Sequence, residues 1–292
     1  MKRIKIITDS HSGIQNAEAK ELDIEVIPMP FSINDEPHME GEDGTDPEWF
    51  VQKLREGVNV NTSQATPFSI MDAFDRALKD YDEVVFIPLS SGLSGSFEMA
   101  NAISMQEEYL GKVFVVDNGR VSTPLHRSIL DAFELKEEGY SAKDIKRILE
   151  ENKSNMAIYV AIDNVEYLKR GGRLSSTASI IVNALNIKPV IYFDTGKLNV
   201  VKKCRGMRKA RREMILAMKE ELETRFAKWY EKGQIYLLAA SSATAEVTES
   251  WVNEIKEAFP GMDVFCEPLS IGLTCHIGPD GLGIGCSCRP ER

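Results

Sequence analysis

The chain has 292 residues, of which 43% are hydrophobic and 27% are charged, a composition typical of a soluble globular protein. Its 35 Lys and Arg residues against 45 Asp and Glu residues give a formal net charge of -10, which argues against a broad surface for nucleic acid or for an anionic membrane. The apolar runs are far shorter than the roughly 20 residues that span a bilayer, so we expect no stable membrane insertion. The length favours two domains.

The N-terminus begins with a strand-like run rather than a signal peptide, because Arg3–Thr8 is rich in isoleucine and an acidic turn follows it. The cysteines are odd in number and scattered, which favours free thiols in a reducing cytoplasm. We therefore expect a cytoplasmic protein. The spacing of Cys286 and Cys288 does not match that of zinc ligands, so we expect no metal. The glycines at 278, 281, 283 and 285 match no phosphate-binding motif, so we expect no cofactor either.

Short apolar strands alternate with amphipathic helices through the first half of the chain, a pattern typical of a mainly parallel α/β sheet. Helices are expected to begin at Pro47 and Pro67, because each proline follows a good N-cap residue, Asp46 or Thr66. The other elements expected here are strands at 3–8, 24–30, 83–89 and 112–117 and helices at 16–22, 96–109, 123–139 and 142–152.

The second half of the chain is patterned differently, and Asp194-Thr195-Gly196 is a clear hairpin signal. We expect a domain boundary near residues 153–156. The elements expected after it are strands at 156–162, 188–193, 197–204, 235–241 and 263–269 and helices at 177–185, 206–232 and 246–259. The chain ends in a Gly-rich segment at 277–285.

Three hydroxyl-rich turns follow strand-like runs, where open α/β sheets place their ligands. They are Thr8-Asp9-Ser10, Thr62-Ser63-Gln64 and the segment Ser90–Ser96. Each turn could simply cap a helix. Together they predict a site for an anion such as a carboxylate or a phosphate, supported by backbone N–H groups at helix starts.

The third turn also resembles the setting of a hydrolase nucleophile elbow, although its fifth position is Ser96 where that motif needs glycine. His276 lies downstream, with Asp263 between them. An acyl hydrolase or transferase that uses Ser94 and His276 therefore stays open as an alternative function. An imidazole ahead of a Gly-rich turn could equally hold a carboxylate without turnover.

Two basic segments stand out in this acidic chain. In the first, Arg170 and Arg173 flank two glycines, which let both guanidinium groups face one site. This segment is either a solvated loop or a contact to an anion or a partner, and a sugar- or phosphate-binding regulator is a third, weaker alternative. In the second segment, Arg205 precedes a predicted helix and is the better candidate for a site.

Taken in their order along the chain, these motifs resemble the DegV family of bacterial fatty-acid-binding proteins, and they cover nearly the whole sequence. The matching segments are Thr8–Ser10, Thr62–Gln64, Ser90–Gly95, Tyr167–Ser175, Ile187–Val190 and His276–Pro279. Each motif is weak alone, whereas the ordered set is highly specific.

The resemblance implies a two-domain α/β fold of the DegV type. Residues 1–154 would form an N-terminal domain on a mainly parallel sheet, and residues 155–292 a C-terminal domain on a mixed sheet. One long-chain fatty acid, such as palmitate, stearate or oleate, would bind non-covalently at the domain junction. Relatives present the fatty acid to a separate fatty acid kinase, which forms an acyl phosphate, so the resemblance implies a binding protein with a kinase partner rather than an enzyme.

The resemblance also assigns site residues. Thr62 and Ser94 would bind the carboxylate, and Arg205 and His276 would complete a polar network nearby. The full implied fatty-acid site consists of Thr62, Ser63, Ser91, Gly92, Ser94, Arg205 and His276. Arg170 and Arg173 are assigned to the domain junction or to docking of the kinase. Asp280 stands where the family usually has glycine, and its carboxylate would repel that of the ligand unless it points outward.

Overall fold

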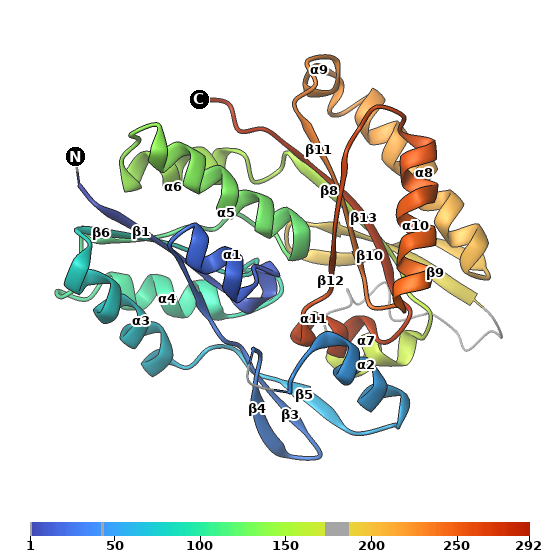
Figure 1. The fold of residues 1–292 in the computed structure, drawn as a ribbon, viewed down its shortest axis with the longest axis horizontal. Coiled ribbons are helices and arrows are strands. Elements are labelled where there is room, and N and C mark those ends of the chain that lie inside the picture. The colour runs from blue at the N-terminus through green and yellow to red at the C-terminus, as the bar shows by residue number, and fades with distance from the viewer. Residues whose placement is uncertain (1, 42–43, 173–186) are drawn as a thin grey trace.

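The computed structural model describes residues 2–41, 44–172 and 187–292. The first part of the chain forms a parallel sheet with strand order β2-β1-β6-β7. Its strands are β1 (Ile4–Asp9), β2 (Ile24–Ile27), β6 (Glu83–Ile87) and β7 (Val113–Val115). The associated helices are α1 (Asn16–Glu21), α3 (Pro67–Asp80), α4 (Ser96–Ser104), α5 (Ser122–Glu137) and α6 (Ala142–Glu151). This arrangement confirms the expected parallel α/β sheet (Figure 1).

Helix starts follow from local sequence. The Asp46 carboxylate accepts the N–H of Trp49 at 2.8 Å and begins α2 (Pro47–Arg55). The Thr66 hydroxyl accepts the N–H of Ser69 at 3.1 Å at the start of α3. In both helices proline occupies the first position, where its missing N–H costs no hydrogen bond.

A small antiparallel sheet with strand order β4-β3-β5 projects from the parallel sheet, and the sequence reading missed it. Its strands are β3 (Pro30–Ile33), β4 (Glu36–Met39) and β5 (Val60–Thr62). The expected single strand at 24–30 instead divides into β2 and the start of β3. This sheet and α2 bring Thr62 toward the C-terminal part of the chain.

The C-terminal part forms a mixed sheet with strand order β10-β9-β8-β13-β11-β12. Its strands are β8 (Met156–Ala161), β9 (Ile187–Asp194), β10 (Lys197–Arg205), β11 (Ile235–Ser241), β12 (Val264–Pro268) and β13 (Leu282–Cys288). Its helices are α7 (Val165–Gly171), α8 (Met207–Glu223), α9 (Ala227–Glu231), α10 (Ala245–Ala258) and α11 (Ile271–Ile277). The expected mixed sheet is confirmed, and the expected boundary at 154–155 falls between α6 and β8.

Several elements differ from the sequence reading. The Gly-rich segment at 277–285 runs into the central strand β13, which is antiparallel to both β8 and β11, and helix α11 precedes it. The helix expected at 206–232 divides into α8 and α9. The basic segment at 169–170 ends α7 rather than lying in a loop, and the helix expected at 177–185 falls outside the described residues.

Strand β13 has two different faces. Leu282, Ile284, Cys286 and Cys288 belong to the core that α8 and α10 cover. Gly283 and Gly285 alternate with them, and a Cβ atom added at Gly285 would meet Pro124 of α5 and Ile158 of β8. Because side chains alternate across a strand, the bulky residues fill one core while the glycines leave the other face of the sheet open.

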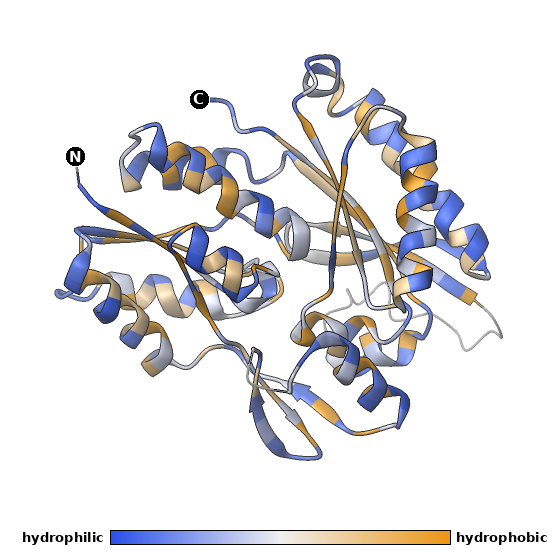
Figure 2. Ribbon diagram, viewed as in Figure 1, coloured by the Kyte–Doolittle hydropathy of each residue, from blue (hydrophilic) through white to orange (hydrophobic). Residues whose placement is uncertain are grey.

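Helix α5 lies between the two sheets. Leu125 and Ile129 pack into the core of the parallel sheet, whereas the Arg127 guanidinium lies 4.3 Å from the ring centre of Tyr236 in β11. The fully buried Arg120, which precedes α5, donates a hydrogen bond to Ser287 Oγ in β13 at 2.6 Å. This is a second contact between the N-terminal part of the chain and the mixed sheet. Hydrophobic residues gather on the strands and the inward sides of the helices (Figure 2). Among the described residues, no helix is long and apolar enough to cross a membrane.

Candidate functional site

A cavity of about 400 Å³ lies between the parallel sheet and the mixed sheet. This volume falls within the roughly 300–1,000 Å³ typical of small-molecule sites. The N-terminal part contributes the turns after β1, β5 and β6 and the start of α5. The C-terminal part contributes β8, β9, β10, β13 and α11. The site therefore forms where the carboxyl ends of parallel strands meet the open face of the second sheet.

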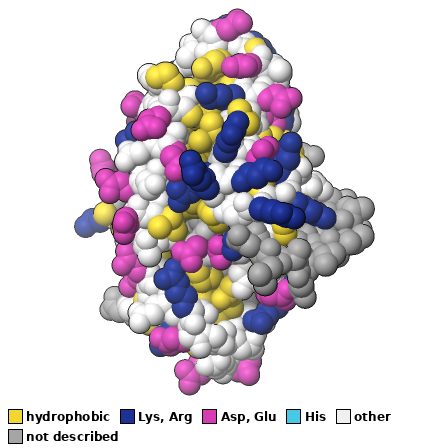
Figure 3. Space-filling view, turned by 90° about the vertical axis from the view of Figure 1, so that its right-hand side faces the viewer, with side chains coloured by type: hydrophobic (Ala, Val, Ile, Leu, Met, Phe, Trp, Pro, Cys, Tyr) yellow, Lys and Arg dark blue, Asp and Glu magenta, His cyan; other side chains and the backbone are white. Residues whose placement is uncertain are grey.

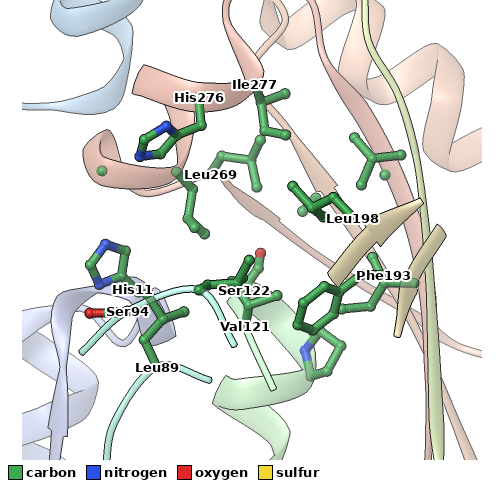
Figure 4. A pocket seen from close by; sticks show the side chains of 18 of the residues that line it. His11, Leu89, Ser94, Val121, Ser122, Phe193, Leu198, Leu269, His276 and Ile277 are labelled. Carbon is green, nitrogen blue, oxygen red and sulfur yellow. The ribbon is translucent and has the colours of Figure 1, made fainter. Parts of the chain in front are cut away.

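One end of the cavity is polar. Thr62 Oγ1 lies 3.1 Å from His276 Nε2, and the hydroxyls of Ser94 and Ser96 are 2.9 Å apart. In Figure 4, His276, His11 and Ser94 lie at this end. Ser63 and Gln64, which also line it, are exposed, so the polar end opens to the protein surface.

The rest of the cavity has a mostly apolar lining. Phe193 and Leu198 lie opposite the histidines in Figure 4. The apolar residues that line this region include Leu89, Leu93, Val121, Ile158, Val160, Phe193, Leu198, Leu269, Leu273 and Ile277. A ligand with a long hydrocarbon chain and one polar head group matches this division.

Two close approaches at the polar end require glycine. A Cβ atom at Gly92 would lie 2.0 Å from Gly196 Cα, so the turn after β6 contacts the β9–β10 hairpin backbone to backbone. A Cβ atom at Gly171 would lie 2.0 Å from Nδ1 of His276, so the end of α7 packs directly against the imidazole. Both glycines therefore fix the position of groups around the head-group region.

Six of the site residues implied by the resemblance come together in this cavity: Thr62, Ser63, Ser91, Gly92, Ser94 and His276 all line it. The Ser91 hydroxyl donates to Asp117 Oδ1 at 2.9 Å, and Asp117 in turn pairs with Lys153 at 2.6 Å. The Ser91 side chain is therefore hydrogen-bonded to the Asp117–Lys153 ion pair, and its backbone forms part of the turn after β6.

The three arginines are placed differently. Arg205 ends β10, is exposed, and is not among the described residues that line the cavity. Figure 3 shows Lys and Arg side chains gathered on the side of the molecule that includes α8 and β10. Arg170 is exposed in the last turn of α7, next to Gly171, and Arg173 lies outside the described residues.

Asp280 and the cysteines do not contribute to the polar end. The Asp280 carboxylate accepts a hydrogen bond from Arg55 Nη2 at 2.8 Å, so it points away from a ligand carboxylate. Burial raises the pKa of the Cys288 thiol to about 12 and also raises the pKa of Cys286. Thiols held protonated in this way are poor metal ligands.

Sequence reasoning missed two features of the site. His11 lines the cavity, although the reading stopped at the preceding Asp9 and Ser10. Its position in a turn directly after the first strand was the available signal. Gly283 and Gly285 of β13 also line the cavity, and no sequence signal distinguished them from loop glycines.

The geometry also bears on the hydrolase alternative. Ser94 Oγ is within hydrogen-bonding distance of Ser96 Oγ, and His276 Nε2 faces Thr62 Oγ1. A nucleophile and its general base should instead contact each other. The structure thus pairs Ser94 with Ser96 and His276 with Thr62 at the polar end.

Sequence comparison identifies relatives of this chain. The profile of the DegV family, described as an uncharacterised protein family, matches residues 3–288. A DegV domain-containing protein of Clostridium perfringens is 30% identical over 291 residues, covering 97% of both chains. Another, from Caldanaerobacter subterraneus, is 32% identical over 288 residues, covering 97% of this chain and 98% of the relative.

Solved structures give the same result. A DegV family protein from Thermus thermophilus, described as fatty acid binding, superposes with a TM-score of 0.86 at 26% identity and covers 98% of this chain and 99% of its own. DegV of Bacillus subtilis, described as a fatty acid binding protein, gives a TM-score of 0.83 at 26% identity over 99% and 100% of the two chains. The family profile, the curated relatives and the fold agree, and the chain therefore belongs to the DegV family.

Proposed function

We propose that this protein binds one long-chain fatty acid non-covalently and presents its carboxylate to a separate fatty acid kinase. The observation that carries the proposal is the divided cavity, whose lining is mostly apolar and which is polar where it opens to the surface. The similar proteins from Thermus thermophilus and Bacillus subtilis are described as fatty acid binding, which supports the same ligand class here.

The hydrocarbon chain would supply most of the binding energy. About 16 methylenes at roughly 0.8 kcal/mol each give a gross transfer free energy of about 13 kcal/mol. The loss of translational and conformational freedom offsets a large part of this gain. Because Phe193 and Ile158 are buried and line the cavity, the tail would lie against apolar side chains, and the polar end is left to set the ligand's orientation.

The carboxylate would lie among Thr62, Ser94 and His276. Hydroxyl groups and an imidazole donate hydrogen bonds to a carboxylate without adding negative charge. Asp280 is held away by Arg55, so this departure from the family pattern is compatible with an anionic head group.

Presentation to a kinase is the finer part of the proposal. Ser63 and Gln64 are exposed at the polar end, so a carboxylate bound there would lie near the surface, within reach of a second protein. Arg170 is exposed one residue before Gly171, which packs against His276, so a partner that contacts Arg170 would lie close to the head group. We assign Arg170 to docking of the kinase.

Two assays test these parts separately. Titration with a fluorescent long-chain fatty acid should reach a stoichiometry of one, and absence of binding would exclude the carrier function. With a fatty acid kinase from the same organism, Arg170→Glu should keep fatty acid binding and lose acyl phosphate formation, whereas Arg147→Glu on the exposed surface of α6 should change neither. Loss of fatty acid binding in Arg170→Glu would contradict the docking role.

A covalent probe separates the carrier from the hydrolase alternative. Fluorophosphonates label serine nucleophiles that an adjacent base activates. We expect Ser94 to remain unlabelled and fatty acid esters to remain intact. Specific labelling of Ser94 with ester turnover would replace the carrier function by an acyl hydrolase or transferase.

A further inference from the structure

We propose that the start of α5 forms a second polar subsite in the wall of the cavity and that this subsite binds an oxygen in the middle of the ligand's chain. Long-chain fatty acids with a mid-chain hydroxyl would then bind more tightly than unsubstituted ones. The inference rests on the proposed function, because it specifies the ligand class of the same fatty-acid site. Two residues carry it, Ser122 and Thr123, and neither belongs to the site that the family resemblance implied.

Ser122 and Thr123 lie in the cavity wall. Both line the cavity, and Figure 4 shows the Ser122 side chain between Ser94, at the polar end, and Phe193, in the apolar part. The preceding residue, Val121, packs in one apolar cluster with Phe193 and Ile158. Two hydroxyl-bearing residues therefore interrupt a region of the lining that is mostly apolar.

Neither hydroxyl is used within the protein. Thr123 is only 3% exposed, yet Thr123 Oγ1 and Ser122 Oγ make no hydrogen bond within the part of the chain that the structure describes. A buried polar group without a partner is unfavourable, and cavities satisfy such groups with water or with a ligand. A ligand oxygen at this place would supply the partner that the fold does not.

The backbone adds donors at the same place. Helix α5 has 16 residues, and no side chain caps its first turn. The first N–H groups of a helix have no partner within the helix, and the aligned peptide dipoles give this end a partial positive charge. An oxygen that accepts hydrogen bonds is stabilised at such an end, whereas a methylene group gains nothing there.

The backbone conformation of Ser122 is also unusual. Its φ of +55° lies in the left-handed region that favours glycine. Residues held in such conformations cluster at binding sites, where the surrounding structure maintains them. At this position, a conformation that glycine adopts more readily is combined with a side chain that carries a hydroxyl and lines the cavity.

A ligand hydroxyl matches this subsite better than a second carboxylate would. A hydroxyl both donates and accepts hydrogen bonds, as the side chains of Ser122 and Thr123 also do. Among the described lining residues only His11 and His276 are ionisable, and Figure 4 places both at the polar end. A second full charge in the tail region would therefore lack a counter-charge.

The test compares fatty acids that differ only in one hydroxyl. Dissociation constants of the intact protein are measured for stearate and for stearates hydroxylated at successive positions, among them 10-hydroxystearate and 12-hydroxystearate. We expect at least one mid-chain isomer to bind about three- to tenfold more tightly than stearate, the gain expected from one net hydrogen bond.

Variants remove the two hydroxyls separately and together. Thr123→Val keeps the shape of the side chain, and Ser122→Gly suits the left-handed backbone. The affinity ratio of the best hydroxystearate to stearate should fall in each variant and should reach about one in the double variant.

Ser128→Ala is the matched control. Ser128 is a buried serine of the same helix whose hydroxyl also has no partner among the described residues, but it is not one of the described residues that line the cavity. The affinity ratio in this variant should equal that of the wild type.

Two outcomes would overturn the inference. One is a wild-type protein that binds stearate at least as tightly as every hydroxylated isomer, and the other is a preference for a hydroxylated isomer that the double variant retains. The proposed function fails separately, if the wild-type protein binds neither stearate nor any hydroxystearate.

Discussion

The Thr62 hydroxyl lies 3.1 Å from Nε2 of His276, although 214 residues separate the two in the sequence. Thr62 ends β5 of the small sheet, whereas His276 lies in α11 of the C-terminal part. The contact joins the two parts of the chain at the polar end of the cavity. A carboxylate bound there would therefore depend on the relative position of the two parts of the chain.

We expect Thr62→Ala and Ser94→Ala each to weaken fatty acid binding without abolishing it. Each variant removes one hydrogen bond to a charged group, which costs about 1.5–3 kcal/mol. Binding survives because the tail supplies most of the free energy. Dissociation constants from fluorescent fatty acid titration give the measurement, and Ser32→Ala in β3 is the control. Unchanged affinity in either site variant would refute that residue's assignment.

Gly171→Ala should weaken binding through His276. The new Cβ atom would lie 2.0 Å from His276 Nδ1, so the imidazole has to move. Alanine is a better helix former than glycine by about 1 kcal/mol, so the helix itself should not suffer. The expected result is lower fatty acid affinity with a nearly unchanged unfolding midpoint. Wild-type affinity in this variant would show that the His276 position is not critical.

Gly283→Val should shift the preference toward shorter fatty acids. An added Cβ atom at Gly283 would meet its nearest neighbours at 3.5 Å or more, which is ordinary van der Waals contact, so a side chain can start there without displacing the backbone. It would occupy space on the cavity face of β13. Competition among saturated fatty acids of increasing length measures the shift, and wild-type selectivity in the variant would contradict the placement of the tail along this strand.

His126 should make stability depend on pH. Its ring lies 3.0 Å from Glu267 and 2.9 Å from Glu18, linking β12, α5 and α1. Burial of the ring lowers its pKa, but the two carboxylates outweigh this effect, and the pKa is raised above its usual 6.5. A raised pKa stabilises the fold fully below pH 6.5, and this contribution is lost as the pH rises through the folded-state value.

The measurement is the free energy of unfolding by urea between pH 5.5 and 8.5. The stability difference between wild type and His126→Gln should be largest at the acidic end and should shrink as the pH rises. His38→Gln serves as the control, because the His38 ring stacks on Phe31 at 5.3 Å in the small sheet. A difference that stays constant over the range would refute a charged His126 bridge.

Much of this fold is predictable because local chemistry marks it. Asp46 and Thr66 cap helices as their side chains dictate, and the period of apolar residues identifies the parallel strands. The polar turns at Thr62 and Ser94 lie after strands, where parallel sheets place their ligands, and the structure brings both to one cavity.

Other elements depend on tertiary context. Glycine is unfavourable in strands. Because β13 contains Gly283 and Gly285, the sequence did not predict this strand, which forms part of the cavity wall. Helix α11 has only 7 residues, too few for a reliable period, and so the backbone around His276 was not predicted. His11 became recognisable only when Asp9 and Gly272 were seen on either side of its ring.

Native mass spectrometry followed by denaturing mass spectrometry of the purified protein, before and after addition of fatty acid, tests the central claim most directly. The account predicts a native mass excess of one fatty acid, present on purification or gained stoichiometrically on addition, that disappears on denaturation and is recovered as free acid in the organic extract. An excess that survives denaturation would indicate an acyl-enzyme, and no excess even with added fatty acid would contradict lipid binding altogether.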